Sequence, residues 1–582
     1  MGARAGAARR RAGRAGAAGG ASGGRGAPAL PGGLRRALER GEDGGGAGAG
    51  TSLAALAAAE ARWAALRAPG GGAPPARPDF LRRLPRPAGA AEMEVDVAVA
   101  GGTLGVFFAC ALQQRGWRVA LVERGRVEGR GQEWNISRRE LAEVVGTGVL
   151  SAQEVEAAVR SDFNPVRAGF HRSNPGRGGG VGDGHVEVQD ILNVGVSPES
   201  LVASARGRFE RAGGTVLEGF ALAGVDACDD GVLLRRAEGG GGLRARLCVD
   251  CMGNSSPIVA QLRRGQRPDG VCLVVGSLAR GFDPACNETG DLIWTDADAR
   301  PGEFRQDFWE AFPAGGAGSS KRTTYLFSYL DAAPERPSLE TLLRDYWERL
   351  GTYQGIPCPD EALDVERVLF GVFPTYKASP LAPGADRVIQ VGDASGLQSP
   401  LSFGGFGALS RHLPRLVGAL NEALETDQLD QASLSAIAAY LPSLSVAWLF
   451  QRAMSIRVGA RTRPDFINQL LGQNFAALES LGPWALRPFL QDVVQFGPLG
   501  LALGKMMLDD PAFTLTILRE LGPGPILEWS GHFLALGLYA GLHRTASPAL
   551  AKLAPALPPA QRFHLNRLRE AWEFGSGSDY RL

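Results

Sequence analysis

The stretch VDVAVAGGTLGVFFACALQQRGWRVALVERG, residues 95–125, decides the fold. Its first residues, Val95–Ala100, form an apolar run that predicts a buried strand, and Arg118–Val122 forms a second one. Between them lie a glycine-rich turn, residues 100–105, and a segment long enough for a helix. The order strand, tight turn, helix, strand is typical of a βαβ unit, whose two strands pair in parallel. The stretch therefore predicts an α/β protein built on a parallel sheet.

The turn follows the pattern G-x-G-x-x-G, with alanine in the first position. Its residues are Ala100, Gly101, Gly102, Thr103, Leu104 and Gly105. In this pattern Gly102 lets the backbone approach a pyrophosphate, and Gly105 lets the helix pack closely on the strand. The helix N-terminus then offers N–H groups and a positive dipole end to the phosphates. We expect a dinucleotide at this turn; the alternative is a glycine-rich turn without a ligand.

The second strand ends at an acidic residue, Glu123, which is followed by Arg124. A carboxylate at this place accepts hydrogen bonds from the hydroxyl groups of a ribose and repels a 2′-phosphate. The site should therefore hold FAD or NAD rather than NADP. Glu123 and Arg124 are both candidate cofactor contacts.

Two later segments have a related form, an apolar strand that runs into a turn. Leu243–Pro257, LRARLCVDCMGNSSP, runs into Asp250 and Gly253. Arg387–His412, RVIQVGDASGLQSPLSFGGFGALSRH, continues from its strand through a turn into a helix. The candidate residues of this second turn are Gly392, Asp393, Pro400, Gly404 and Gly405.

With these three motifs in order, residues 95–424 resemble the FAD-dependent oxidoreductases of the geranylgeranyl reductase, lycopene cyclase and aromatic hydroxylase superfamily. The resemblance implies a Rossmann-like FAD-binding domain with an inserted β-sheet substrate domain. It implies that Asp393 binds the ribityl chain of FAD, and that Asp250 and Gly253 lie near the cofactor. The helix after Gly405 would point its N-terminus at the flavin, where a positive dipole end stabilises the anionic reduced form.

Within this superfamily, four segments most resemble plant and algal plastid proteins labelled lycopene β/ε-cyclase-like. They read EWNISR, GVCLVVGS, WEAFPAG and QSPLSFGGFG. This label rests on relatedness and does not establish a reaction. The sequence carries no second dinucleotide fingerprint, so NAD(P)H, if it reduces the flavin, would dock transiently.

The loop after the second strand, residues 129–137, is a further candidate. In the superfamily this loop passes the cofactor, which implies that Arg130 and Trp134 touch the cofactor or the substrate. A surface loop with one half-buried tryptophan fits equally well. Cys248 and Cys251 have the spacing of a redox pair, but two buried thiols at a strand end are favoured.

Two aromatic-rich segments, Phe308–Pro313 and Thr323–Tyr329, are expected to form adjacent strands. They would build an apolar cavity over the flavin for an isoprenoid or another lipid, or an ordinary β core. Lycopene cyclases carry a paired-carboxylate motif in this neighbourhood. The corresponding strand here, Tyr325–Tyr329, has no carboxylate, which leaves Glu310 as the nearest candidate acid and puts cyclase chemistry in doubt.

The chain has 582 residues, of which 45% are hydrophobic and 21% charged. We expect four parts: a disordered leader and linker at 1–90, an FAD-binding domain at 91–270 and 366–425, a β-sheet substrate domain at 271–365, and a C-terminal helical domain at 426–582. Seven cysteines in so long a chain do not make a disulfide scaffold. The six histidines form no recognisable metal-ligand cluster.

The leader contains arginine but no acid before Glu39, which is typical of an organelle transit peptide and here suggests the plastid. The folded body should begin near Glu92. The remaining chain is net acidic, which argues against a nucleic-acid partner. The apolar run Phe533–Leu542 is too short to span a bilayer and suits an interfacial helix, so peripheral membrane association stands beside simple helical packing. The polar tail, Gly575–Leu582, is expected to fray.

Three functions remain open. The first is flavin-dependent redox chemistry on a hydrophobic, isoprenoid- or carotenoid-type substrate, with NAD(P)H or another electron donor. The second is a redox-neutral cyclisation or isomerisation in which Glu310 acts as the acid. The third is a non-catalytic thylakoid scaffold or assembly factor with FAD as a structural element.

Overall fold

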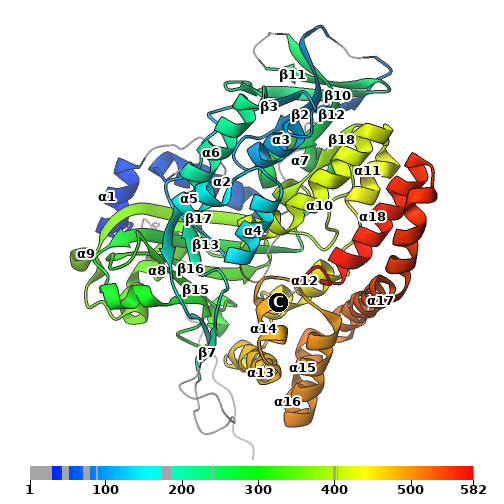
Figure 1. Cartoon of the computed structure of the whole chain (residues 1–582). Helices are drawn as coiled ribbons and strands as arrows, with labels where there is room; N and C mark the ends of the chain where they lie inside the picture. The colour runs from blue at the N-terminus through cyan, green and yellow to red at the C-terminus, as the bar shows by residue number, and fades with distance from the viewer. Residues whose placement is uncertain are drawn as a thin grey trace, which may run out of the picture.

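The computed structural model describes residues 29–41, 51–69, 79–86, 89–172, 185–237, 241–397, 402 and 404–580. Figure 1 shows one sheet at the top, a second sheet below it, and the C-terminal helices packed along one side.

The first sheet has the strand order β1-β10-β11-β12-β2-β3-β9, and β18 also pairs with β12. Its strands are β1 (Leu81–Arg83), β2 (Ala91–Ala100), β3 (Val119–Val122), β9 (Thr215–Leu217), β10 (Leu222–Cys228), β11 (Gly231–Arg236), β12 (Gly242–Asp250) and β18 (Val388–Gln390). Strands β18, β12, β2, β3 and β9 run parallel, so their carboxyl ends lie at one edge. This is the parallel core that the opening stretch predicts.

Helices cover both faces of the first sheet. They are α3 (Gly105–Gln113), α4 (Arg138–Gly146), α5 (Ala152–Ala158), α6 (Pro198–Arg211), α7 (Pro257–Arg263) and α10 (Gly405–Thr426). Residues 105–112 of α3 are all buried, because this helix lies between β2, α6 and α10. Ile258 of α7 packs on the opposite face with Ala98 and Ala120. A buried core on each face is what doubly wound α/β domains require.

The second sheet has the order β17-β13-β16-β15-β14-β6-β7. Its strands are β6 (Val166–Gly169), β7 (His185–Val188), β13 (Gly270–Arg280), β14 (Gly290–Trp294), β15 (Phe308–Ala314), β16 (Lys321–Leu330) and β17 (Asp364–Thr375). Residues of β15 and β16 pair from Phe308↔Phe327 to Ala314↔Lys321, which confirms the predicted adjacency of these two strands. A small third sheet joins β4 (Trp134–Ile136), β8 (Val194–Val196) and β5 (Val159–Asp162).

The residues after α10 fold into helices, several of which cover one face of the second sheet. They are α11 (Gln431–Ile437), α12 (Pro442–Ala453), α13 (Phe466–Leu481), α14 (Pro483–Leu490), α15 (Phe496–Asp509), α16 (Pro511–Leu521), α17 (Pro523–Leu553) and α18 (Pro559–Gly575). Among the described helices, none alone has the length and apolar character to cross a bilayer; only the pair α11 and α12, bent by 65°, meets that test together.

The expectation of a disordered leader and linker over residues 1–90 is wrong for three segments: α1 (Gly32–Arg40), α2 (Leu53–Arg67) and strand β1, which pairs with β10 and has Leu81 buried. Helix α1 buries Leu34 and Leu38, and α2 buries Trp63 completely. Both helices pack with α8 (Leu339–Gln354) over the second sheet, near the short α9 (Pro359–Ala362). The folded body therefore begins well before Glu92, because apolar side chains at helical spacing outweigh the Ala/Gly/Arg composition. Residues 1–28 lie outside the described residues.

Two further expectations are corrected. Strand β17 continues to Thr375 in the second sheet, so the substrate sheet does not end at residue 365. The C-terminal tail is not frayed as far as Tyr580. Asp579 accepts hydrogen bonds from Arg411 at 2.6 and 2.7 Å, and the Arg139 guanidinium lies 3.8 Å from the ring centroid of Tyr580. These tertiary contacts tie the tail to α10 and α4.

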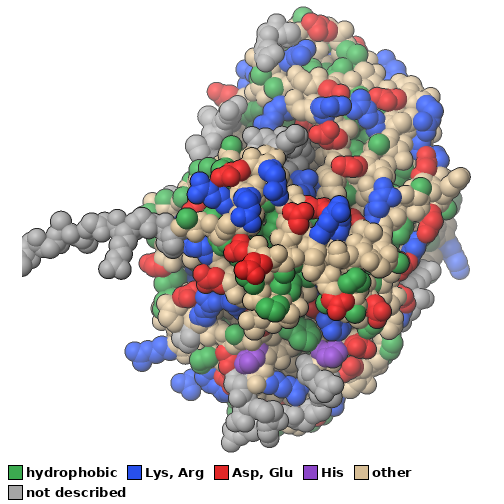
Figure 2. Space-filling model, turned by 90° about the vertical axis from the view of Figure 1, so that its left-hand side faces the viewer, with side chains coloured by type: hydrophobic (Ala, Val, Ile, Leu, Met, Phe, Trp, Pro, Cys, Tyr) green, Lys and Arg blue, Asp and Glu red, His purple; other side chains and the backbone are tan. Residues whose placement is uncertain are grey.

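The face of the molecule that includes α1 and α9 carries charges of both signs. Figure 2 shows acidic and basic side chains interspersed across that face rather than gathered into a field of one sign. Over the whole sequence the formal net charge is +1.

Candidate active site

The three sequence motifs meet at the carboxyl edge of the first sheet. Ala100 and Asp250 are register partners, and Asp250 in turn pairs with Gln390. The Cys251 N–H donates to the Ala100 carbonyl at 2.7 Å. A Cβ atom placed on Gly253 would lie 3.9 Å from the Cβ of Asp393. The glycine turn, the β12 turn and the Gly392-Asp393 turn therefore form one continuous surface.

The glycine turn has the geometry that its pattern requires. Gly101 has a φ of +104°, and a Cβ there would lie 2.6 Å from the Cys251 carbonyl oxygen. A Cβ on Gly102 would lie 2.8 Å from a methyl group of Val127, and one on Gly105 would lie 3.0 Å from Val99. A side chain at any of these positions would force the turn or the helix away from the strand.

The first turn of α3 is open to an anion. No side chain caps its N-terminus, where Thr103 and Leu104 lead into the helix. The Glu123 carboxylate lies beside the turn, where it accepts from the Gly102 N–H at 2.7 Å and from the Gly125 N–H at 2.9 Å. Arg124 is exposed on the same loop. The arrangement offers N–H donors for a phosphate next to a carboxylate for a ribose.

The two aspartates of the later motifs differ in role. Asp250 has no exposed surface, and its carboxylate accepts from the Met252 N–H at 3.0 Å and from the Ser256 hydroxyl at 2.6 Å. Burial raises its pKa to about 6. Asp250 thus shapes the turn through its own hydrogen bonds, and its place among the cofactor contacts stays a prediction.

Asp393 has an accessible side chain, and its carboxylate makes no hydrogen bond within the described residues. The surrounding protein removes part of its hydration and raises its pKa. An accessible, unpartnered acceptor between the β12 turn and α10 is free to bind a ligand hydroxyl.

Helix α10 begins next to Asp393. Its N-cap is Gly404, no side chain caps it, and its Leu409 lies against Gly392. Phe406 in the first turn packs against Trp134 with ring centroids 4.6 Å apart. The positive end of this helix dipole therefore faces the edge where the motifs meet. Pro400, another predicted contact, lies outside the described residues.

One face of the second sheet carries neighbouring polar side chains, Glu310 and Tyr325, which the loop after β3 approaches. Glu310 of β15 pairs in register with Tyr325 of β16. Gln132, on the loop after β3, donates to the Tyr325 hydroxyl, and Arg130 of that loop lies close enough to lower the pKa of Tyr325 against the larger, opposite effect of burial. The loop thus contacts the second sheet through its polar side chains.

Glu310 is 5% exposed, and its Oε1 has no hydrogen-bond partner within the described residues. Burial raises its pKa well above the ordinary value, and the charge of Asp492 adds to this effect. A carboxyl with a raised pKa keeps its proton to a higher pH than an ordinary glutamate and is suited to act as an acid.

Sequence reasoning missed Asp492 and Ser402. The Ser402 N–H and hydroxyl donate to the Asp492 carboxylate at 3.0 and 2.6 Å, which links the turn before α10 to the segment after α14. Asp492 lies 182 residues from Glu310 in the chain, and no local pattern marked it.

A small apolar pocket lies at β14, the strand next to β15. Its lining residues, from β14 and helices α12 to α14 together with Ser402, are Leu292, Ile293, Ser402, Phe450, Met454, Leu471, Phe475, Phe489 and Leu490. It lies between the second sheet and the C-terminal helices, so those helices supply most of its wall. The cavity has a volume of about 10 Å³, room for about one water molecule, so a hydrophobic ligand would enter here only if the walls move apart.

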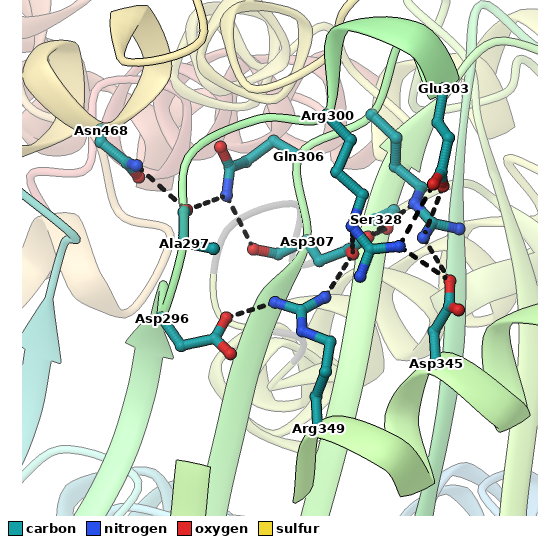
Figure 3. Close-up of polar contacts among 11 residues, drawn as sticks. Asp296, Ala297, Arg300, Glu303, Gln306, Asp307, Ser328, Asp345, Arg349 and Asn468 are labelled. Carbon is teal, nitrogen blue, oxygen red and sulfur yellow. Dashed lines mark hydrogen bonds and ion pairs between the residues drawn. The ribbon is translucent and has the colours of Figure 1, made fainter. Parts of the chain in front are cut away.

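A buried ion network anchors the start of β15 (Figure 3). Asp307, 4% exposed, accepts from Arg349 at 2.6 Å and from the Ser328 hydroxyl at 2.6 Å. Arg305 pairs with Asp307 and Asp345. Because Asp307 precedes the strand directly, these contacts fix the position of Glu310 three residues later.

The cysteine pair has no sign of redox chemistry. Cys248 and Cys251 are free, and burial raises the pKa of both thiols. Cys248 is buried and Cys251 is half-buried, so the favoured interpretation of two buried thiols holds for Cys248 alone. The described residues contain no group of three or more His, Cys, Asp or Glu placed to hold a metal ion.

No family model and no curated protein matches the sequence. Solved structures do. The halogenase PltM is 12% identical over 83% of this chain and 96% of its own, with a TM-score of 0.51. PltM in complex with phloroglucinol and FAD aligns over 83% of this chain and 98% of its own at 13% identity, with a TM-score of 0.47. A geranylgeranyl bacteriochlorophyll reductase-like protein from Thermoplasma acidophilum is 13% identical over 74% of this chain and 98% of its own, with a TM-score of 0.47.

At such identities the likeness to PltM concerns the fold, which covers nearly the whole of that protein. It confirms the predicted α/β fold class, with a Rossmann-like sheet, a second sheet and a C-terminal helical region. The individual cofactor contacts stay predictions, although the structure places nearly all of them at one edge.

Proposed function

We propose that the chain is an FAD-dependent oxidoreductase that acts on a hydrophobic substrate. The observation that carries the proposal is the meeting of the glycine turn and Asp393 at one sheet edge, through the Gly101–Cys251 and Gly253–Asp393 contacts. PltM, whose fold the chain shares, has been solved with FAD, which agrees with this choice of cofactor.

Each part of the edge fits one part of an extended FAD. The N–H groups at the start of α3 would bind the diphosphate, which the lack of a side chain on Gly102 lets approach, and Glu123 would bind the adenosine ribose. Asp393 would accept from the ribityl hydroxyls, and the start of α10 would stabilise negative charge on the ring system. The bound flavin would supply hydride transfer or oxygen activation.

The remaining residues would bind and orient the substrate. The apolar pocket and the aromatic face of β15 and β16 would exclude water, and Gln132 would hold the Tyr325 hydroxyl in place. Glu310 would hold a proton close to the substrate. An isoprenoid or carotenoid-type substrate is our choice within the hydrophobic class, because the lining is formed by aliphatic and aromatic side chains.

The first test is the colour and redox response of the purified chain. We expect the absorbance of oxidised flavin at close to one FAD per chain, and bleaching by NADPH or NADH under anaerobic conditions. Asp393→Ala should lower the flavin content, whereas Asp229→Ala, an exposed aspartate on the β10–β11 hairpin, should not. A colourless protein that binds no added FAD would reject the proposal, and a flavin inert to every donor would favour the scaffold.

A redox-neutral cyclase or isomerase is the second candidate, favoured by the protonated character of Glu310. In that reaction the Glu310 carboxyl would donate its proton to a polyene, and Asp492 and burial would keep it protonated. We expect chemically reduced protein to convert lycopene without consuming NADPH, and Glu310→Gln to abolish conversion. If Glu310→Gln leaves a NADPH-dependent reaction intact, the oxidoreductase is favoured.

We also propose that the protein contacts a lipid surface through α15 to α17. Their exposed apolar side chains include Leu501, Leu508, Leu515, Leu527, Leu534 and Leu538. Between Trp529 and Leu542 the sequence has no Asp, Glu, Lys or Arg, which suits an interfacial helix. Leu508→Glu with Leu527→Glu should abolish flotation with vesicles. Self-association without flotation would instead indicate a second copy on this face.

The plastid is the proposed compartment, on the basis of the arginine-containing, acid-free start of the sequence. A fusion of residues 1–90 to a fluorescent protein should enter plastids, and a fusion that stays in the cytosol would reject this assignment.

A further inference from the structure

The end of the chain packs against the segment that follows α14, residues 491–495. The Gln495 side chain donates to the Gly577 carbonyl at 2.8 Å, and the Tyr580 hydroxyl donates to Gln491 Oε1 at 2.5 Å. A Cβ on Gly577 would lie 2.9 Å from a methyl group of Val493, so the two backbones approach closely. The tail, residues 577–580, therefore holds the segment 491–495 at both of its ends.

The tail has anchors of its own on the first half of the molecule. Arg411 of α10 donates two hydrogen bonds to the Asp579 carboxylate. Arg139 of α4 lies over the Tyr580 ring and donates to the Asp579 carbonyl at 3.2 Å. Charged hydrogen bonds and a guanidinium on an aromatic ring are among the stronger contacts in proteins. They fix the place from which the Tyr580 hydroxyl reaches Gln491.

Gln491 connects the tail to the strand beside α10. Its Nε2 donates to the Ser137 hydroxyl oxygen at 2.6 Å, and Ser137 is 1% exposed. Ser137 directly follows β4, whose Trp134 packs on Phe406 in the first turn of α10. The Gln491 amide thus accepts from the tail with its oxygen and donates to the start of α4 with its nitrogen.

Asp492, the next residue, connects the same segment to the approach of α10. Its carboxylate binds the Ser402 N–H and hydroxyl. The Ser402 hydroxyl oxygen accepts from the N–H of Gly404, the N-cap of α10, at 3.4 Å. The charge of Asp492 also acts on Glu310 of the second sheet. A shift of the segment 491–495 would therefore change the place of α10 and the surroundings of Glu310.

We propose that Tyr580 and Gln491 are positioning residues of the candidate site. Through Ser137 and, by way of Asp492, through Ser402, they hold β4 and the start of α10 in the arrangement that binds the flavin. The inference rests on the proposed function and adds to it two residues outside the sequence motifs. Without the tail contact only a fraction of the chains has this arrangement, and the apparent affinity for FAD falls by that fraction.

A double-mutant cycle on the full chain tests the connection. Tyr580→Phe keeps the ring beside Arg139 and removes the hydroxyl, and Ser402→Ala removes the hydroxyl that Asp492 binds. Each single variant should bind FAD roughly three- to tenfold more weakly than wild type. The double variant should be within about twofold of the weaker single variant, because both changes break one chain of contacts. The visible spectrum of bound flavin should change alike in both single variants.

Amide hydrogen exchange of the flavin-free chain gives a second readout, which does not depend on the cofactor. Tyr580→Phe and Gln491→Leu should both speed exchange at the start of α10, residues 404–410, because its support is weakened. Tyr440→Phe is the matched control: the Tyr440 hydroxyl forms a hydrogen bond of 2.6 Å with His532 on α17. This control should leave exchange at residues 404–410 unchanged and the Kd for FAD within about twofold of wild type.

Unchanged exchange at residues 404–410 in Tyr580→Phe would overturn the proposal. Effects on the Kd that multiply in the double variant would overturn it as well, since they would show that Tyr580 and Ser402 act independently. If Tyr580→Phe lowers the thermal midpoint and changes neither exchange nor Kd, the tail only stabilises the fold and the proposal is wrong. A wild-type chain that binds no FAD is a separate result, which rejects the proposed function.

Discussion

The two halves of the candidate site are built in different ways. At the edge of the first sheet, the glycine turn, the start of α3 and Glu123 lie within one stretch, residues 100–123, and Glu123 contacts Gly102 of the same stretch, although Asp393 joins them from a distant part of the chain. On the face of the second sheet, Glu310, Ser402 and Asp492 come from three distant parts of the chain. The first half is formed mainly by residues close in sequence and suits one cofactor. The second half is formed by residues that only the tertiary structure brings together, and such residues can differ between proteins with different substrates.

The largest expected effect concerns the local half. Gly102→Val places methyl groups where a Cβ already lies 2.8 Å from Val127 and 3.2 Å from Glu123. The turn must open, so we expect the purified protein to lose its flavin, with FAD affinity reduced more than 100-fold, and stability lowered by about 1–3 kcal/mol. Flavin absorbance per chain and thermal midpoint measure both effects.

The control for Gly102→Val is Gly472→Ala on α13, where a Cβ would meet nothing within 4 Å. Helix propensity predicts a gain of about 0.5–1 kcal/mol there and unchanged flavin content. If Gly102→Val keeps a full complement of FAD, the glycine turn is not the phosphate site.

The next effect tests the junction of the motifs. Asp393→Ala removes an accessible carboxylate, and a hydrogen bond to a charged group contributes about 1.5–3 kcal/mol. We therefore expect FAD to bind roughly ten- to a hundredfold more weakly, with little change in thermal midpoint of the flavin-free protein. Titration of the flavin-free protein with FAD measures the Kd of each protein. An unchanged Kd in Asp393→Ala would show that Asp393 does not bind the cofactor.

The tertiary half should show itself in the pH dependence of stability. The folded pKa of Glu310 is raised by burial, so its contribution to stability is fully present below the ordinary pKa of about 4.5 and is lost as pH rises through the folded pKa. Gln cannot ionise. Above pH 4.5, Glu310→Gln should therefore gain on wild type by up to ~1.4 kcal/mol per pH unit. Denaturation of both proteins at several pH values between 5 and 8 measures the difference in their free energies of unfolding. If this difference does not change with pH, Glu310 ionises normally.

The smallest effect concerns the tail. The side chains of Arg411 and Asp579 are 14% and 9% exposed. Asp579→Asn should cost about 1–2 kcal/mol, because it weakens a shielded ion pair. In the exposed pair Arg463–Asp465, with side chains 53% and 38% exposed, Asp465→Asn should cost less than about 0.5 kcal/mol. Equal thermal midpoints for the two variants would show that the tail is not held by Arg411.

The sequence predicted the local half well, because a G-x-G-x-x-G turn between two apolar strands leaves the backbone few alternatives. It also predicted that β15 and β16 pair, since both segments are short, aromatic and apolar. It failed for α1, where composition suggested disorder although Leu34, Ala37 and Leu38 have helical spacing and are buried.

The remaining misses have one physical reason. Ser402 and Asp492 are 90 residues apart, so only the packed chain brings them together. Nothing in the neighbourhood of Asp492 distinguishes it from a surface aspartate. Burial and partner charges, which determine its effect on Glu310, are properties of the tertiary structure.

The most direct measurement is an experimental structure of the chain with FAD bound. We expect density for an extended FAD whose diphosphate contacts Gly102 and the start of α3, and whose ribityl chain lies within hydrogen-bond distance of Asp393. An FAD bound elsewhere, or a diphosphate at Gly102 with the ring system directed away from Asp393 and α10, would contradict the account.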